Sequence, residues 1–273
     1  MKKRVSTILL ILVLLAGVSL LLYPSISDYW NSLHQSRAIT EYADAVANLN
    51  TEQNERLLQA AKEFNDRLYH SGAGLNLPEE MLEDYNAQLN VSGDGVMGYI
   101  EIPSIDCSLP ICHGTDSAVL QHSVGHIEGS SLPVGGESTH CVLSGHRGLP
   151  SAKLFTDLDR LAVGDVFILR TLDQTLTYEV DQILIVEPHQ VSALAIQPGE
   201  DLCTLVTCTP YGVNSHRLLV RGHRIENQEI AKVARVTADA MQVRPAYVAV
   251  FIAAAMLLLV FVILALRARR RRR

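Results

Sequence analysis

The stretch TLVTCTPYGVNSHRLLVRG, residues Thr204–Gly222, contains two short apolar segments joined by a turn. The first segment ends at Cys208, which a Thr-Pro pair follows, and the second begins at Arg217. If the two segments pair as antiparallel strands, the eight residues 209–216 form the connecting loop. Cys208 and Arg217 then stand opposite each other at one rim of a sheet. The stretch therefore predicts a β fold that places a thiol beside a cation.

Further segments of this kind follow Val96. They are short, rich in β-branched and apolar residues and bounded by Gly, Pro or Asp: MGYIEIP, CVLSG, DVFILRTL, LTYEVDQILIVEP, LCTLVTC and RLLVRGHRI. Strands at such short spacing, with no long helix between them, are typical of a closed β-barrel or a sandwich. Residues 149–165 are expected to add one short helix or turn. We therefore expect a mostly β domain over residues 96–228.

A helical region is expected before the strands. Apolar residues between Leu57 and Leu68 recur at i, i+4, i+7 and i+11, which places them on one face of a helix. Asn50 and Gln53 can form a capping box at the start of that helix, and an earlier helix is expected over about 36–48. We interpret residues 24–95 as a helical stalk or a bracket against the β domain. A plain spacer is the alternative.

Both ends of the chain carry an apolar run beside basic residues. Residues 5–23 follow the basic start 1–4, and residues 246–266, reached through a linker at 229–245, precede the Arg-rich tail 267–273. About twenty uncharged residues suffice to cross a bilayer. Because the first run shows no convincing cleavage site, an uncleaved anchor is favoured over a removed signal peptide. The sequence thus predicts one transmembrane helix at each end.

The charge distribution predicts the orientation of these helices. Positive charge lies on the outer side of both runs, so the positive-inside rule places both termini in the cytoplasm and the intervening region outside the cell. The Arg tail is interpreted as a stop-transfer signal that also contacts anionic lipid. Outside the two tails, 14 Lys and Arg stand against 29 Asp and Glu, a net charge of −15. This charge argues against a general nucleic-acid binder.

The cysteines raise a separate question. The chain has five: Cys107, Cys112, Cys141, Cys203 and Cys208. An odd number in an exported domain leaves at least one thiol free. Cys141 and Cys203 can form a disulfide if their strands are neighbours, although we favour two buried free thiols.

His146 in CVLSGHRGLP is the candidate partner of the Cys208 thiol. It follows a short apolar strand, and the flanking Gly145 and Gly148 allow a sharp turn that exposes the imidazole. A nearby imidazole activates a thiol for acyl transfer, and a cation favours the thiolate and stabilises an oxyanion. These residues alone leave the plainer alternative open. A cysteine at a strand end more often packs as a small apolar residue, and nine other histidines compete with His146.

A metal site is a further alternative. The candidate ligand sets are Cys107, Cys112 and His113, or His140, Cys141 and His146. The C-x-x-C pair typical of zinc sites is absent. Neither a P-loop nor a dinucleotide-binding fingerprint occurs. We therefore expect neither a metal nor a cofactor.

The combined pattern resembles the sortases, the cell-wall transpeptidases of Gram-positive bacteria. It consists of TLVTC, an Arg nine residues after the Cys, and SGHRG upstream. The likeness is denser to class C, the pilin-polymerising branch, and extends over about residues 98–225 through GYIEIPSID, HGTDSAVLQHSVGHIEGSSLPVGGESTH and VDQILIVEPH. It implies an eight-stranded β-barrel with short helices. At the matching positions it implies that Cys208 is the nucleophile, His146 the general acid/base and Arg217 the oxyanion-stabilising cation.

The resemblance also implies a reaction. The thiolate attacks the Thr-Gly peptide of an LPXTG-like sorting signal on a pilin, and His146 protonates the leaving amine. A Lys amine of another pilin then resolves the thioester as an isopeptide bond. One alternative acceptor is a peptidoglycan amine, which would make the protein an anchoring sortase. An alternative of another class is a non-catalytic β-barrel that serves as an adhesin or pilus scaffold.

One feature departs from the class C pattern. Enzymes of this class often carry a lid with an Asp-Pro-aromatic tripeptide ahead of the barrel, and no such tripeptide occurs here. The corresponding segment, 70–95, is broken by Gly, Pro and Asn, with one short helix expected near 78–89. We therefore predict a shortened or absent lid and a more open thiol.

Overall fold

The computed structural model describes residues 2–227 together with Met256 and Val260, and for residues 2–4 only the backbone. The linker 229–245, the second apolar run 246–266 and the Arg tail expected from the sequence lie outside the described residues, except for those two positions. The chain divides into two units, Met1–Trp30 with Ile230–Arg273, and Asn31–Glu229.

The N-terminal helix is longer than the sequence predicted. α1 (Lys2–Ala47) contains both the apolar run 5–23 and the helix expected over 36–48, with Pro24 inside it. Proline removes one backbone hydrogen bond, which a long helix can tolerate when its other bonds are kept. The described part of α1 is long and apolar enough to cross a membrane.

The second helix begins as the sequence predicted. In α2 (Thr51–Ser71) the Asn50 side-chain oxygen accepts from the Gln53 N–H at 2.8 Å, and the Gln53 side-chain oxygen accepts from the Asn50 N–H at 2.9 Å. This is the expected capping box. Phe64 and Leu68 bury the apolar face of the helix in the core of the β domain.

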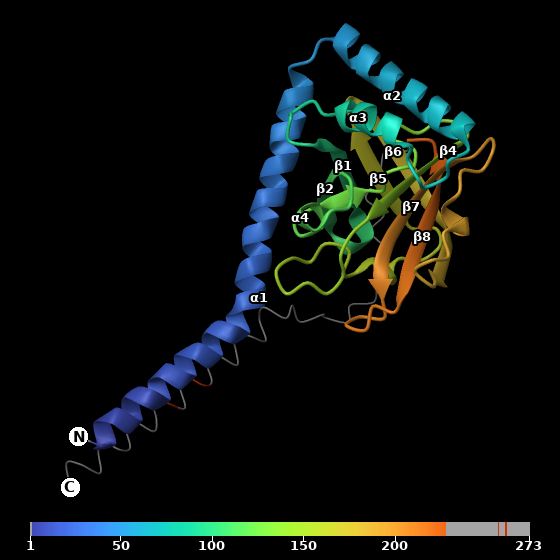
Figure 1. Cartoon of the computed structure of the whole chain (residues 1–273). Coiled ribbons are helices and arrows are strands. Elements are labelled where there is room, and N and C mark those ends of the chain that lie inside the picture. The colour runs from blue at the N-terminus through green and yellow to red at the C-terminus, as the bar shows by residue number, and fades with distance from the viewer. Residues whose placement is uncertain (1, 228–255, 257–259, 261–273) are drawn as a thin grey trace. The chain divides into compact units, whose positions relative to one another are not determined.

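A third, short helix covers the barrel beside α2 (Figure 1). α3 (Glu79–Ala87) lies within the predicted segment 78–89. Its buried Tyr85 hydroxyl contacts His126 Nδ1 at 3.0 Å and accepts the Gly114 N–H at 3.0 Å. These hydrogen bonds fix α3 to the strands below it.

Eight strands form a closed barrel in the order β1-β2-β3-β4-β7-β8-β6-β5. The bounds are β1 (Val96–Ile102), β2 (Cys107–His113), β3 (Val124–His126), β4 (Thr139–Ser144), β5 (Val166–Thr171), β6 (Gln174–Val186), β7 (Asp201–Thr209) and β8 (His216–Ile225). The short helices between them are η1 (Pro103–Ile105), α4 (Ser117–Leu120), η2 (Leu158–Arg160) and η3 (Ser192–Leu194). The prediction of a mostly β, eight-stranded barrel is confirmed. η2 is the turn expected within 149–165, whereas β2 and β3 were not among the predicted strand segments.

The pairing of β4, β7 and β8 positions the candidate site. β4 and β7 are parallel, with Cys141 opposite Cys203 and Ser144 opposite Val206. β7 and β8 are antiparallel, with Cys208 opposite Arg217. Alternate residues of β7 face inward to the main core and outward to a smaller apolar cluster.

Candidate active site

Three strand ends bring the predicted residues to one rim of the barrel. Cys208 and Arg217 are partners in the β7–β8 ladder, as the sequence predicted, although the strands extend further than expected and the loop is only 210–215. The β4–β7 ladder ends at Ser144 and Val206. Since His146 and Cys208 each lie two residues beyond that pair, they occupy equivalent positions on neighbouring parallel segments. The order across the rim is therefore His146, Cys208, Arg217.

The loop that carries His146 is fixed to β7 by its backbone. Gly145 N–H donates to the Val206 carbonyl at 3.0 Å, and the Thr207 hydroxyl donates to the Gly145 carbonyl at 2.7 Å. The His146 carbonyl accepts from Phe155 N–H at 3.1 Å. A Cβ at position 145 would lie 2.6 Å from the Phe155 ring, so only glycine fits there. The imidazole is partly exposed at the end of this loop.

Arg217 lies on the same face of the sheet as Cys208. Its Nη1 donates to the Asn214 carbonyl at 3.3 Å and to the His216 carbonyl at 3.1 Å, which holds the guanidinium against its own turn. Within residues 5–227, Arg217 makes no ion pair with a carboxylate. Its positive charge can therefore act on a negative oxygen that forms on a group bound at Cys208.

A small, buried apolar cluster adjoins the thiol on the outer face of the sheet. Val142 of β4, Val206 of β7, Leu219 of β8 and Leu194 of η3 form a cluster separate from the barrel core. Leu75, from the segment between α2 and α3, packs on it. Cys208 shares this face of β7 and is partly exposed. The shortened or absent lid and the more open thiol stay predictions.

The remaining cysteines differ from Cys208. Cys141 and Cys203 are buried free thiols, as favoured from the sequence. Burial raises the pKa of Cys203 well above its usual range, raises that of Cys107 to about 12, and raises that of Cys112. These three thiols are therefore protonated and poor nucleophiles near neutral pH.

The structure separates the residues of the alternative metal site. Among the described residues, no group of three or more His, Cys, Asp and Glu side chains is placed to hold a metal ion. His140 contacts Thr204 Oγ1 at 2.7 Å on the outer face, whereas Cys141 faces the core. His122 and His126 have the H-x-x-x-H spacing that is typical of zinc ligands. Their rings instead contact protein groups: His122 Nδ1 contacts Asn31, and His126 Nδ1 contacts Tyr85.

Two residues at this rim, Arg147 and Tyr211, were not among the site residues predicted from the sequence. Arg147 directly follows His146, and its guanidinium lies 5.8 Å from the centroid of the Tyr211 ring in the β7–β8 loop. Arg147 also pairs with Asp159. The available signal was the SGHRG motif, where a second ionisable side chain follows the histidine.

A closed β-barrel with a cysteine, a histidine and an arginine at one rim is typical of a cysteine-dependent acyl-transfer enzyme. Comparisons with known proteins indicate the same class of enzyme. The Sortase domain family matches residues 100–225. Sortase C1 of Streptococcus agalactiae is 52% identical, with a TM-score of 0.69 over 70% of this chain and 100% of that one. A Streptococcus pneumoniae sortase C, whose structure is described in terms of pilin substrate specificity, is 44% identical, with a TM-score of 0.64 over 70% and 97%.

A curated relative agrees over a shorter length. Sortase D of Bacillus subtilis is 34% identical over 131 residues, which are 47% of this chain and 63% of that protein. The chain belongs to the sortase family, and its solved neighbours are class C sortases. Sortases are cysteine transpeptidases that act on LPXTG-type sorting signals.

Proposed function

We propose that this protein is a membrane-anchored transpeptidase that cleaves an LPXTG-like signal through a thioester and joins pilin subunits by a Lys isopeptide bond. The observation that carries the proposal is the alignment of His146, Cys208 and Arg217 across three neighbouring strand ends. The identity to class C sortases supports pilins as substrates.

In the first proposed step, the Cys208 thiolate attacks the Thr carbonyl carbon of the signal, and an oxyanion forms. Arg217, which lies opposite Cys208 and makes no ion pair with a carboxylate within residues 5–227, stabilises that charge. The C–N bond to Gly then breaks, and the His146 imidazolium gives its proton to the leaving amine. The product is a thioester between Sγ and the Thr carbonyl.

In the second step, a Lys amine of another pilin attacks the thioester carbonyl. His146, now a neutral imidazole, takes the proton of the amine, and Sγ leaves as the thiolate. The new bond is an isopeptide. A peptidoglycan amine can replace the Lys amine without any change in this chemistry, so the acceptor defines the difference between polymerisation and anchoring.

The proposed topology follows from the two apolar runs. α1 supplies one anchor that is long and apolar enough to span the bilayer. Together with a second span at 246–266, it would place both termini in the cytoplasm and residues 24–245 outside. We propose residues 96–228 as the catalytic domain within that exported part.

The proposal is tested with the full-length protein in detergent micelles, an LPXTG peptide and a Lys-containing acceptor peptide. We expect intact mass spectrometry to show a covalent adduct on Cys208 and then its transfer to Lys. Cys208→Ala should give no adduct. If this variant cleaves the peptide as fast as the parent, the enzyme assignment is wrong; transfer only to a peptidoglycan stem peptide would instead identify an anchoring sortase.

A further inference from the structure

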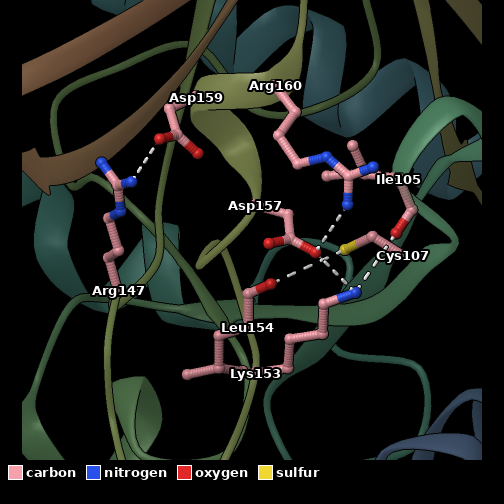
Figure 2. Close-up of polar contacts among 8 residues, drawn as sticks. All are labelled: Ile105, Cys107, Arg147, Lys153, Leu154, Asp157, Asp159 and Arg160. Atoms are coloured by element: carbon pink, nitrogen blue, oxygen red, sulfur yellow. Dashed lines mark hydrogen bonds and ion pairs between the residues drawn. The ribbon is translucent and has the colours of Figure 1, made fainter. Parts of the chain in front are cut away.

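Arg147 connects three segments around the candidate site. It follows His146 in the chain, pairs with Asp159 in η2, and donates from Nη1 to the Thr209 hydroxyl at 3.5 Å (Figure 2 shows the pair with Asp159). Its guanidinium also faces the Tyr211 ring. The side chain is only 10% exposed. A cation within about 6 Å of a ring centroid is attracted to the ring.

These contacts lie next to both reacting groups. Thr209 directly follows Cys208, and His146 directly precedes Arg147, so one side chain joins the two neighbouring segments beyond the end of the β4–β7 ladder. The loops also touch through Gly148, where a Cβ would lie 2.9 Å from the Tyr211 ring. The backbone hydrogen bonds of Gly145 fix the start of the loop, whereas Arg147 fixes it beyond the imidazole.

The buried position of Arg147 lowers stability, which indicates that the side chain is kept there for its contacts. The Arg147 Nε is buried and has no hydrogen-bond partner among the described residues. A buried donor without a partner destabilises the fold. The planar guanidinium nevertheless reaches a carboxylate, a hydroxyl and an aromatic ring at once, which the single ammonium of a lysine does not do.

Arg160, in the η2 turn that also holds Asp159, provides a natural comparison. Arg160 in η2 pairs with Asp157 at 3.4 Å and is 46% exposed, and Lys153 pairs with the same carboxylate at 2.8 Å (Figure 2). Within residues 5–227, the Arg160 guanidinium pairs with Asp157 and makes no ion pair or hydrogen bond with the loops of His146 and Cys208. Arg160 therefore serves as the matched control for Arg147.

We propose that Arg147 is a positioning residue, which holds the His146 loop against the strand end that carries Cys208. The proposal rests on the roles proposed for Cys208 and His146. Removal of Arg147 lets the imidazole move relative to the thiol. It does not alter the outer apolar cluster of Val142, Leu194, Val206 and Leu219 beside β7. Since small displacements of reacting groups are costly to rate, kcat should fall while KM changes little.

The test uses full-length protein in detergent and measures kcat and KM for LPXTG peptide cleavage. Arg147→Ala should lower kcat on the order of 10²-fold with KM within about twofold of the parent. Arg147→Lys keeps the charge and should recover part of the loss. Arg160→Ala should retain parental kinetics. Asp159→Asn changes a half-exposed carboxylate, so it is less expected to disturb folding than Arg147→Ala. It should give a smaller fall in kcat.

The outcomes separate this inference from the proposed function. If Cys208→Ala is inactive but Arg147→Ala and Asp159→Asn match Arg160→Ala, Arg147 has no positioning role. A rise in KM as large as the fall in kcat would also overturn the positioning role. So would a lowered melting temperature that accounts for the lost activity of both variants. If Cys208→Ala stays active, the proposed function fails first.

Discussion

Two thiols on one strand have opposite environments. Cys203 and Cys208 both lie on β7, five residues apart, so their side chains face opposite sides of the sheet. Cys203 is 0% exposed and packs in the barrel core, whereas Cys208 is partly exposed at the rim, opposite Arg217. Strand parity and distance from the rim, more than residue type, therefore decide which cysteine can react.

The largest expected effect separates the two thiols by activity. Cys208→Ser should lower LPXTG peptide cleavage by about 10³-fold or more, because the proposed nucleophile is lost. Cys203→Ala should keep kcat within a few-fold of the parent. Steady-state kinetics of both variants check this, and a Cys203→Ala protein that folds but has no activity would contradict the distinction.

The next effect concerns the cation opposite Cys208. Arg217→Ala should lower kcat by about 10²- to 10³-fold, the usual loss when an oxyanion-stabilising group is removed. Arg224→Ala, at a partly buried arginine farther along β8, is the control for loss of a charge from the same strand. Equal losses in the two variants would mean that the position opposite the thiol is not special.

Thiol labelling compares the cysteines without mutation. In native full-length protein, iodoacetamide should modify Cys208 first, because burial raises the pKa values of Cys203, Cys107 and Cys112 and because Cys141 is only 2% exposed to the reagent. Denatured protein should take up label at all five. Peptide mapping over time checks the order. Very slow labelling of Cys208 would refute the prediction of an open thiol and point to a closed cover.

Stability should separate the thiols in the reverse direction. Cys203→Ser puts a hydroxyl into the apolar core and should lower the free energy of unfolding by about 1–3 kcal/mol. Cys208→Ser at the partly exposed rim should change it by less than about 0.5 kcal/mol. Urea titration of both variants in the same detergent measures the difference. A more stable Cys203→Ser protein would show that this position is not apolar.

The smallest expected effect is on the pH dependence of stability. β7 also carries Thr204, which contacts His140, and burial lowers the pKa of His140 from 6.5. The unfolded chain therefore binds this proton more readily, so stability is full above pH 6.5 and falls as pH decreases toward the folded-state pKa. His140→Gln should show a shallower fall in melting temperature below pH 6.5. The exposed His189→Gln should retain the parental slope.

Local patterns allowed most of the fold to be predicted. Segments such as β5 and β8 are short, rich in apolar and β-branched residues and bounded by turn residues, so their type could be inferred from sequence alone. β2 contains Pro110, and β3 has only three residues, so their strand character depends on neighbouring strands rather than on local preference. α1 continues through Pro24, so the apolar run 5–23 and the helix predicted from about residue 36 belong to one helix.

The site could be predicted in part for the same reason. Cys208 and Arg217 belong to one hairpin, so their pairing follows from the length of a short loop. His146 lies beside the segment of Cys208 only because β4 and β7 pair in parallel, which joins residues 62 apart in the chain. His146 was therefore singled out through the sortase resemblance and not through local spacing. The contacts of Arg147 with Asp159 and Tyr211 depend on side-chain packing across two loops, which no local pattern encodes.

The strand order also bears on when the protein becomes active. β8, the last strand among the described residues, lies between β7 and β6 rather than at an edge. It supplies Arg217 and completes the barrel, so a chain still emerging during synthesis or export has an unfilled gap beside Cys208. The surroundings of Cys208 are therefore complete only once the chain through residue 225 has folded into the barrel.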